Sequence, residues 1–174
     1  IRDSKMALQK ELGLTVDPNV MLVGAVSRLT WQKGFYLMME KLSEICAMPI
    51  QVAILGSGES GIEEKMRQLE EGNKGKIAFY NGYSDSLAHR IYAASDLFLM
   101  PSLFEPCGIS QLISMRYGTL PLVRETGGLK DTVTPYNEFD KTGNGFSFAN
   151  YNSDEMVQVM YNAIDVYYNL SLIH

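Results

Sequence analysis

The chain has 174 residues, a length that suits one globular domain. Hydrophobic residues make up 46% and charged residues 20%, a composition that excludes a disordered chain or a fibrous repeat. Asp and Glu total 20 against 15 Lys and Arg, a formal charge of -5. Because no basic run is present to follow a nucleic-acid backbone or an anionic membrane, any anionic ligand must meet a local positive site.

Short aliphatic runs alternate with amphipathic stretches, beginning with a helix expected over residues 4–13. Nearly continuous apolar runs predict buried strands at 20–26, 50–55, 76–80, 97–100, 120–124 and 145–148. Apolar spacings of three and four predict helices at 35–46, 59–71, 86–94, 109–117 and 153–168. Ser153 is the expected N-cap of the last helix.

This alternation is typical of an α/β fold with a doubly wound, parallel, Rossmann-like sheet flanked by helices. Parallel neighbours need a crossover, and a helix supplies it while burying one face of the sheet. We expect a single domain of this kind over residues 1–174.

Cysteine content and hydropathy bear on the compartment. Cys46 and Cys107 are too few and too far apart for a disulfide framework or a zinc cage, which is typical of a reducing compartment. The apolar runs are far shorter than a membrane-spanning helix, and the first residues lack the pattern of a signal peptide. We therefore expect an intracellular protein.

Two loops carry the most distinctive chemistry. Residues 27–34 (SRLTWQKG) follow the first expected strand, and residues 101–108 (PSLFEPCG) follow the fourth. In a doubly wound sheet the ligand binds outside the carboxyl ends of the strands, where strand order reverses, commonly between the first and fourth strands. The two loops should therefore face each other across one crevice.

The first of these loops is the candidate anion site. Arg28 and Lys33 precede a helix expected to start near Gly34, which allows close backbone approach. Two cations beside the positive end of a helix suit a phosphate or diphosphate. Either residue alone is more typical of a solvated surface, but their joint position at the expected switch point favours diphosphate binding.

The second loop offers a carboxylate and a helix start. Glu105 lies between Phe104 and Pro106, and Gly108 opens the next expected helix. The carboxylate can accept hydrogen bonds from sugar hydroxyls, while Ser110 and the first N–H groups of the helix can meet phosphate oxygens. An ordinary acid at a helix N-terminus explains Glu105 equally well.

Other candidates are less specific. Tyr83 follows the third expected strand and can stack on a base, the alternative being a ring half-buried under a loop. Gly56 and Gly58 follow the second expected strand and are typical of a common turn. The first strand is not followed by a GxGxxG dinucleotide motif, and the sequence contains neither a P-loop motif nor a DxD pair. His89 is expected on a helix surface and not as a general base.

The motif residues resemble those of bacterial glycogen synthases and plant starch synthases. The resemblance runs over roughly residues 5–169. Its matching positions are 27–34, 104–111, 115–119, Pro121, 123–124, 126–129 and 131–133.

The resemblance implies the C-terminal, donor-nucleotide half of a GT-B transferase, an enzyme built from two Rossmann-like domains. Such an enzyme transfers glucose from ADP-glucose to α-1,4-glucan with retention of configuration, without a metal or a resident cofactor. The alternatives are another GT-B transferase that uses a UDP-sugar such as UDP-glucose, and a non-catalytic module that binds nucleotide or glucan. No nucleic-acid or membrane partner is implied.

The resemblance also implies residue roles. Arg28 and Lys33 match residues that hold the diphosphate and neutralise the leaving group, and Glu105 matches an acid near the transferred glucose. Roles in donor-nucleotide and phosphate binding fall to Tyr83, Gly108 and Ser110. At position 113, where many related transferases have a second Glu that binds ribose, this chain has Ile113, so that role is not transferred.

The family's N-terminal acceptor domain has no counterpart in these residues. We therefore expect the glucan acceptor to be held by a domain that the chain lacks, so that the chain alone binds nucleotide weakly and transfers no glucose. The expected location is the bacterial cytoplasm, or the plastid for a plant parent.

Overall fold

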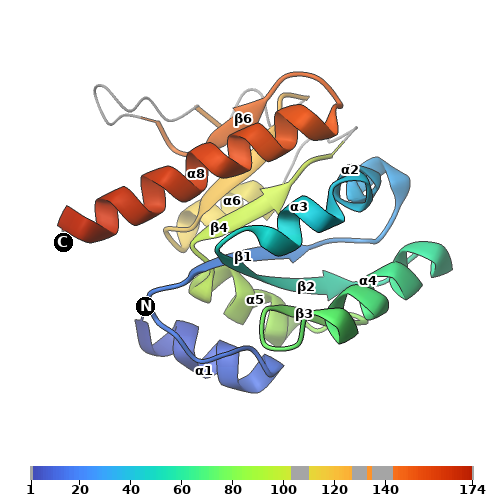
Figure 1. The fold of residues 1–174 in the computed structure, drawn as a ribbon, viewed down its shortest axis with the longest axis horizontal. Coiled ribbons are helices and arrows are strands. Elements are labelled where there is room, and N and C mark those ends of the chain that lie inside the picture. Colours follow the sequence, from blue (N-terminus) through green and yellow to red (C-terminus); the bar gives the residue numbers. More distant parts are fainter. Residues whose placement is uncertain (1, 103–109, 127–132, 135–142, 174) are drawn as a thin grey trace.

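The computed structural model describes residues 2–102, 110–126, 133–134 and 143–173 of the chain. Within them, one six-stranded parallel sheet has the order β3-β2-β1-β4-β5-β6. Its strands are β1 (Met21–Val26), β2 (Ile50–Gly56), β3 (Ile77–Asn81), β4 (Leu97–Met100), β5 (Leu120–Arg124) and β6 (Phe146–Phe148). The order reverses between β1 and β4 (Figure 1), as the doubly wound prediction requires.

The helical elements lie close to their predicted positions. They are α1 (Arg2–Leu12), the short 3-10 turn η1 (Trp31–Lys33), α2 (Phe35–Glu40), α3 (Leu42–Ala47), α4 (Ser60–Gly72), α5 (Asp85–Ala94), α6 (Ser110–Arg116) and α8 (Ser153–Ile173). The last helix continues five residues beyond its predicted end at 168.

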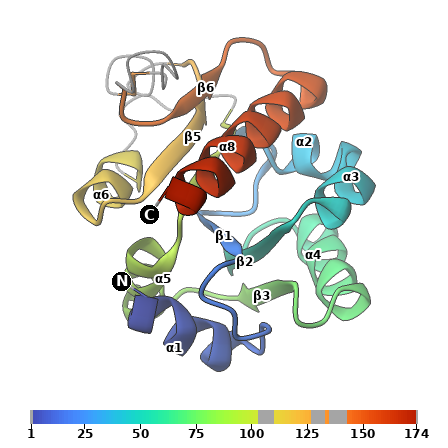
Figure 2. The same ribbon diagram turned by 60° about the vertical axis from the view of Figure 1, so that its left-hand side comes forward.

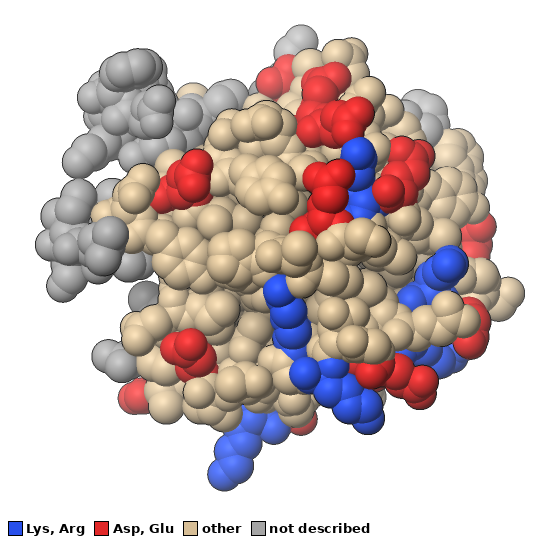
Figure 3. Space-filling view, in the orientation of Figure 1, with Lys and Arg blue, Asp and Glu red and all other residues tan. Residues whose placement is uncertain are grey.

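The prediction of one helix over 35–46 was wrong, because the backbone leaves helical geometry at Lys41 (φ -122°, ψ 24°) and divides the segment into α2 and α3. At the break, the Lys41 Nζ lies 2.5 Å from a carboxylate oxygen of Asp154 in α8 and 3.4 Å from Glu44. Figure 3 shows acidic side chains gathered around a basic one where α8 begins beside these two helices. The break therefore coincides with an ion pair to α8.

Ser153 is not the N-cap of α8, as the sequence had suggested. The Oδ1 of Asn152 accepts hydrogen bonds from the backbone N–H groups of Asp154 (2.8 Å) and Glu155 (3.1 Å). The Ser153 hydroxyl instead donates to Glu40 in α2 at 2.8 Å. Ser153, which the local sequence indicated as the cap, therefore makes a tertiary contact with α2 instead.

Two hydrophobic layers hold the sheet between helices (Figure 2). Helices α2, α3, α4 and α8 cover one face, where Met38, Met66 and Met160 are at most 2% exposed. Helices α1, α5 and α6 cover the other, around Leu8 and Ile91. Strands β1, β2 and β4 are buried along their whole length, while the last two residues of β3 are exposed. Burial on both faces accounts for the continuous apolar runs in the sequence.

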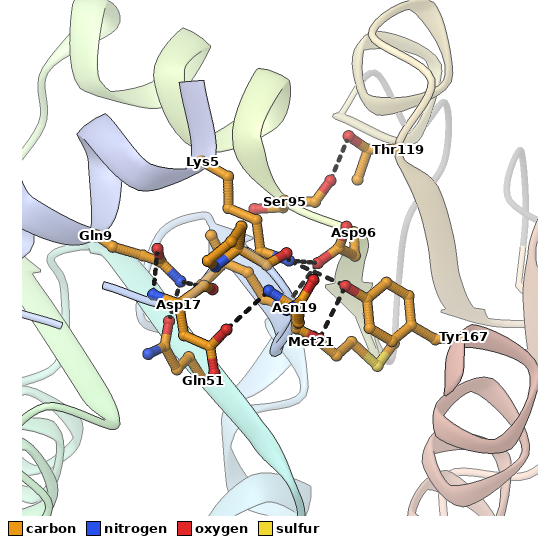
Figure 4. A network of polar contacts seen from close by, with 12 residues as sticks. Lys5, Gln9, Asp17, Asn19, Met21, Gln51, Ser95, Asp96, Thr119 and Tyr167 are labelled. Atoms are coloured by element: carbon orange, nitrogen blue, oxygen red, sulfur yellow. Dashed lines mark hydrogen bonds and ion pairs between the residues drawn. The ribbon is translucent and has the colours of Figure 1, made fainter. Parts of the chain in front are cut away.

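At the amino edge of the sheet, where the strands begin, a buried Lys joins the first and last helices (Figure 4). The Lys5 ammonium is 2.7 Å from Asp96, 3.1 Å from the Tyr167 hydroxyl and 3.2 Å from the Pro18 carbonyl. The same Asp96 oxygen accepts the backbone N–H of Leu22. Burial lowers the pKa of Lys5, but the hydrogen bond and charge of Asp96 outweigh it and raise the pKa above 10.5.

A pair of buried amides fastens α1 to β2 beside this Lys. The Gln9 amide donates to the Asp17 carbonyl and to Gln51, each at 2.8 Å, while the Asp17 N–H donates back to Gln9. Gln51 donates onward to the Thr15 carbonyl at 2.7 Å. Because these groups satisfy one another, their burial carries little desolvation penalty.

Candidate functional site

The loops that follow β1 and β4 meet at the carboxyl edge of the sheet. Gly34 has a φ of 83°, and a Cβ added there would lie 2.1 Å from the Pro101 carbonyl oxygen. Only glycine fits both the left-handed backbone and this close approach. The predicted meeting of the two loops is confirmed for these residues, and the backbone that Gly34 allows to approach is that of Pro101.

A cavity at this edge, here called the Tyr83 cavity, has a volume of about 460 Å³. The ends of β1 and β2, the turn before α5, α5 itself and α6 all contribute to its wall. Its lining includes Ser27, Arg28, Gly56, Ser57, Gly82, Tyr83, Asp85, His89, Tyr92 and Ile113. Arg28 is exposed, so the guanidinium is available to a ligand in the cavity.

Tyr83 presents its ring at the mouth of this cavity. It is 73% exposed, so the alternative of a ring half-buried under a loop is wrong. Its hydroxyl donates to the Asp85 carboxylate at 2.5 Å, and this hydrogen bond raises the pKa of Tyr83. The next residue, Ser84, caps α5 by accepting from the Leu87 N–H. The ring is therefore tethered at its hydroxyl and open on its faces.

His89 lies on the exposed surface of α5, as predicted, but it also lines the Tyr83 cavity. Its Nδ1 is 3.0 Å from the Tyr117 hydroxyl. The ring of Tyr117 in turn stacks parallel to Tyr92, with 6.5 Å between centroids. Ile113 places an aliphatic side chain in the same wall, at the position where many related transferases have a carboxylate.

Lys33 lies on the other side of the end of β1. It is half-buried and lines a small cavity between the ends of β1 and β4, together with Pro101 and Ser102. Val26 and Ser27 line both this cavity and the Tyr83 cavity. The structure thus brings Arg28 and Tyr83 together in one cavity and places Lys33 in the neighbouring one. The end of β1 separates the two cavities.

A third cavity of about 340 Å³, here called the Trp31 cavity, was not predicted. It is lined by Arg28, Thr30, Trp31, Gln32 and Glu59. No local sequence signal identifies it, because Glu59 belongs to the loop after β2 and reaches Trp31 only in the folded chain. Since Arg28 lines both, the Trp31 cavity adjoins the Tyr83 cavity.

The turn at Gly56 and Gly58 packs the loop after β2 against the loop after β1. A Cβ at Gly56 would lie 2.2 Å from the Ser27 carbonyl oxygen, and one at Gly58 would lie 2.5 Å from that of Leu29. The Leu29 N–H donates to Ser57, and its carbonyl accepts from Glu59, each at 2.9 Å. These two glycines therefore serve loop packing.

Three predicted site residues, Glu105, Gly108 and Ser110, lie wholly or in part outside the described part of the structure. Glu105 and Gly108 belong to the undescribed stretch 103–109. Ser110 is the first residue of α6, and its side chain is likewise outside the described part. Their roles remain predictions.

The described residues contain neither a metal-binding cluster nor a membrane-spanning helix. No three His, Cys, Asp or Glu side chains lie together there in a way that could hold a metal ion. In the same part of the chain, no helix has the length and apolar character needed to cross a bilayer.

The sequence matches the glycosyl transferases group 1 family over residues 5–165, and the chain belongs to that family. Its fold is that of one Rossmann-like half of a GT-B glycosyltransferase. The catalytic domain of starch synthase IV from Arabidopsis thaliana, solved with ADP and acarbose, aligns with a TM-score of 0.87 and 35% identity, over 95% of this chain and 35% of that one. The predicted fold class is thereby confirmed.

The chain is also similar to bacterial glycogen synthases. It is 54% identical to that of Lachnospira eligens over 166 residues and 46% identical to that of Desulfitobacterium hafniense over 168 residues. These alignments cover 95% and 97% of this chain but 35% and 36% of the two relatives. The predicted resemblance is confirmed, and the chain spans about a third of the length of these relatives.

Proposed function

We propose that this chain is the donor-nucleotide domain of a retaining glucosyltransferase that extends α-1,4-glucan from ADP-glucose. The observation that carries the proposal is the placement of Arg28 and Lys33 on either side of the end of β1, with the exposed ring of Tyr83 in the adjoining cavity. Similarity to glycogen synthases, and the ADP bound to the starch synthase neighbour, support it.

The cavities suggest how the donor would lie. A base stacked on the open face of Tyr83 leaves its ribose and phosphates directed toward Arg28 at the end of β1. Lys33 then approaches the diphosphate from the β4 side. By resemblance, Gly108 and Ser110 at the start of α6 would complete the phosphate contacts.

The cations have a chemical role in transfer. When the bond from glucosyl C1 to the phosphate oxygen breaks, its electron pair stays on the departing ADP, and positive charge develops on the sugar ring. A glucan hydroxyl then forms the new bond to C1, and its proton passes to the departing diphosphate. Fixed cations beside the diphosphate stabilise this charge separation more than the intact donor. By resemblance, Glu105 would lie near the transferred glucose.

We also propose that this domain works together with a second domain of the same enzyme. The relatives are about three times longer than the aligned region, which is long enough for a separate domain. By resemblance, that domain is N-terminal and holds the glucan acceptor. The activity is then a property of the two domains together, in the cytoplasm of a bacterium or in a plastid.

Nucleotide titration and one substitution test this function. Calorimetry of the chain with ADP, UDP and GDP should show preference for ADP, and a preference for UDP would reject the assigned donor. In the parent synthase, Lys33→Ala should lower kcat by about 10- to 150-fold, the loss expected for one charge-assisted hydrogen bond. Lys65→Ala removes an exposed Lys of α4 and serves as the matched control. Unchanged turnover in Lys33→Ala would contradict the role of Lys33.

A further inference from the structure

The Trp31 cavity combines one aromatic ring with four hydrogen-bonding side chains. Arg28, Gln32 and Thr30 offer donors, while Glu59, Gln32 and Thr30 offer acceptors. Its two charged side chains, Arg28 and Glu59, have opposite signs, so the lining has no net charge. Such a lining suits a neutral ligand rich in hydroxyl groups better than an anion or an apolar molecule.

The indole of Trp31 is presented to solvent on a fixed backbone. The side chain is 44% exposed. Its backbone N–H donates to Glu59 at 2.8 Å, and its carbonyl accepts from the Tyr151 hydroxyl at 3.3 Å. The 3-10 turn that carries the ring is therefore tied both to the loop after β2 and to the segment before α8, which limits the entropy lost when a ligand orders it.

A second exposed aromatic flanks the same carboxylate. The Tyr36 hydroxyl donates to Glu59 at 3.2 Å, and Tyr36 is 43% exposed. This bond raises the pKa of Tyr36. Glu59 thus holds two aromatic residues in place with its two oxygens, which makes it the organising residue of the cavity.

The ligand chemistry follows from these contacts. A pyranose ring presents C–H groups on its face, which pack on the electron-rich face of an indole, and hydroxyl groups around its edge, which both donate and accept. We propose that the Trp31 cavity binds a glucosyl unit of the acceptor glucan, so that the donor-nucleotide domain itself helps to hold the acceptor. The identity of the sugar as an α-1,4-glucan rests on the proposed function.

Arg28 lies between the Trp31 cavity and the proposed site of the donor diphosphate. Because it lines both the Trp31 and the Tyr83 cavities, a sugar beside Trp31 lies next to the place proposed for the donor diphosphate. A glucosyl unit there can belong either to the acceptor or to the donor sugar, and the test must separate the two.

Trp31 is the single tryptophan of the chain, so its fluorescence reports the cavity directly. Maltoheptaose, ADP and ADP-glucose are titrated separately into the 174-residue chain, with N-acetyltryptophanamide correcting for the effect of sugar on the solvent. Nucleotide binding is followed in parallel by calorimetry. We expect maltoheptaose to change the emission saturably and to protect Trp31 from iodide quenching.

Variants identify the contacts. Trp31→Ala, followed by calorimetry, should weaken maltoheptaose binding about tenfold or more, and Glu59→Gln about threefold to tenfold. Both losses should exceed any loss of ADP affinity. Tyr161→Ala is the matched control, because this ring of α8 is 40% exposed and lines none of the cavities described above; it should bind maltoheptaose within twofold of the parent chain.

The outcomes separate the two proposals. Binding of ADP without any response of Trp31 to maltoheptaose overturns the sugar site and leaves the proposed function standing. A response to ADP-glucose but not to maltoheptaose also overturns it, because the cavity then takes the donor sugar. A response to maltoheptaose in a chain that binds no ADP or ADP-glucose supports the sugar site and rejects the proposed function.

Discussion

At the amino edge of the sheet, Lys5, Gln9 and Gln51 are at most 4% exposed, and their hydrogen-bond partners lie within the chain. At the carboxyl edge, Trp31 and Tyr83 are 44% and 73% exposed and line cavities. The difference shows that buried polar side chains which satisfy one another stabilise the fold, while exposed aromatic rings that line a cavity are available to a ligand.

Gly34→Ala tests whether the close packing of Gly34 against Pro101 at the carboxyl edge stabilises the fold. The new Cβ would meet the Pro101 carbonyl at 2.1 Å in a left-handed backbone, so we expect the free energy of unfolding to fall by about 3–5 kcal/mol. Gly13→Ala is the matched control, since Gly13 has a φ of 75° with nothing within 4 Å; it should cost about 1 kcal/mol. Urea unfolding measures both, and equal losses would show that the contact with Pro101 adds nothing.

Lys5→Met tests the opposite edge. Removing the ammonium leaves the Asp96 carboxylate, whose side chain is only 21% exposed, without the Lys5 cation, so the free energy of unfolding should fall by about 2–4 kcal/mol. ADP affinity, measured by calorimetry on folded protein, should stay unchanged. Lys10→Met on the exposed side of α1 is the control, with a change within about 0.5 kcal/mol. A tenfold loss of ADP affinity in Lys5→Met would end the separation of the two edges.

The same Lys predicts a pH dependence. Because the folded-state pKa of Lys5 lies above the unfolded value of 10.5, its contribution is fully present below pH 10.5 and is lost as the pH rises through the folded-state pKa. The difference in unfolding free energy between the parent chain and Lys5→Met should therefore shrink above pH 10.5. A difference that is constant into that range would contradict the ion pair with Asp96.

Asn152→Ala has the smallest expected effect. It removes the acceptor for two N–H groups at the start of α8 and should cost about 1 kcal/mol in thermal or urea unfolding. Asn152→Asp retains an acceptor and should restore most of the loss. If Asn152→Ala proves neutral, the cap is not a source of stability at this edge.

The sheet could be predicted because its strands are largely apolar and buried, and the switch point followed from the alternation of strands and helices. Arg28, Lys33 and Tyr83 could be singled out because they follow strand ends, where the structure has cavities. The break at Lys41 was missed because Lys41 pairs with the distant Asp154. The cap at Asn152 was missed because the expected cap, Ser153, bonds to the distant Glu40. Glu59 was missed because its partners Trp31 and Tyr36 precede it by more than twenty residues.

The contact between Lys5 of α1 and Tyr167 of α8 brings the first and last helices together on the side of the molecule opposite the cavities. An affinity tag or biotin joined at either end would therefore anchor the protein to a sensor surface with its binding face turned outward. Immobilised in that orientation, the domain should retain unobstructed access to nucleotides and oligosaccharides in flow measurements.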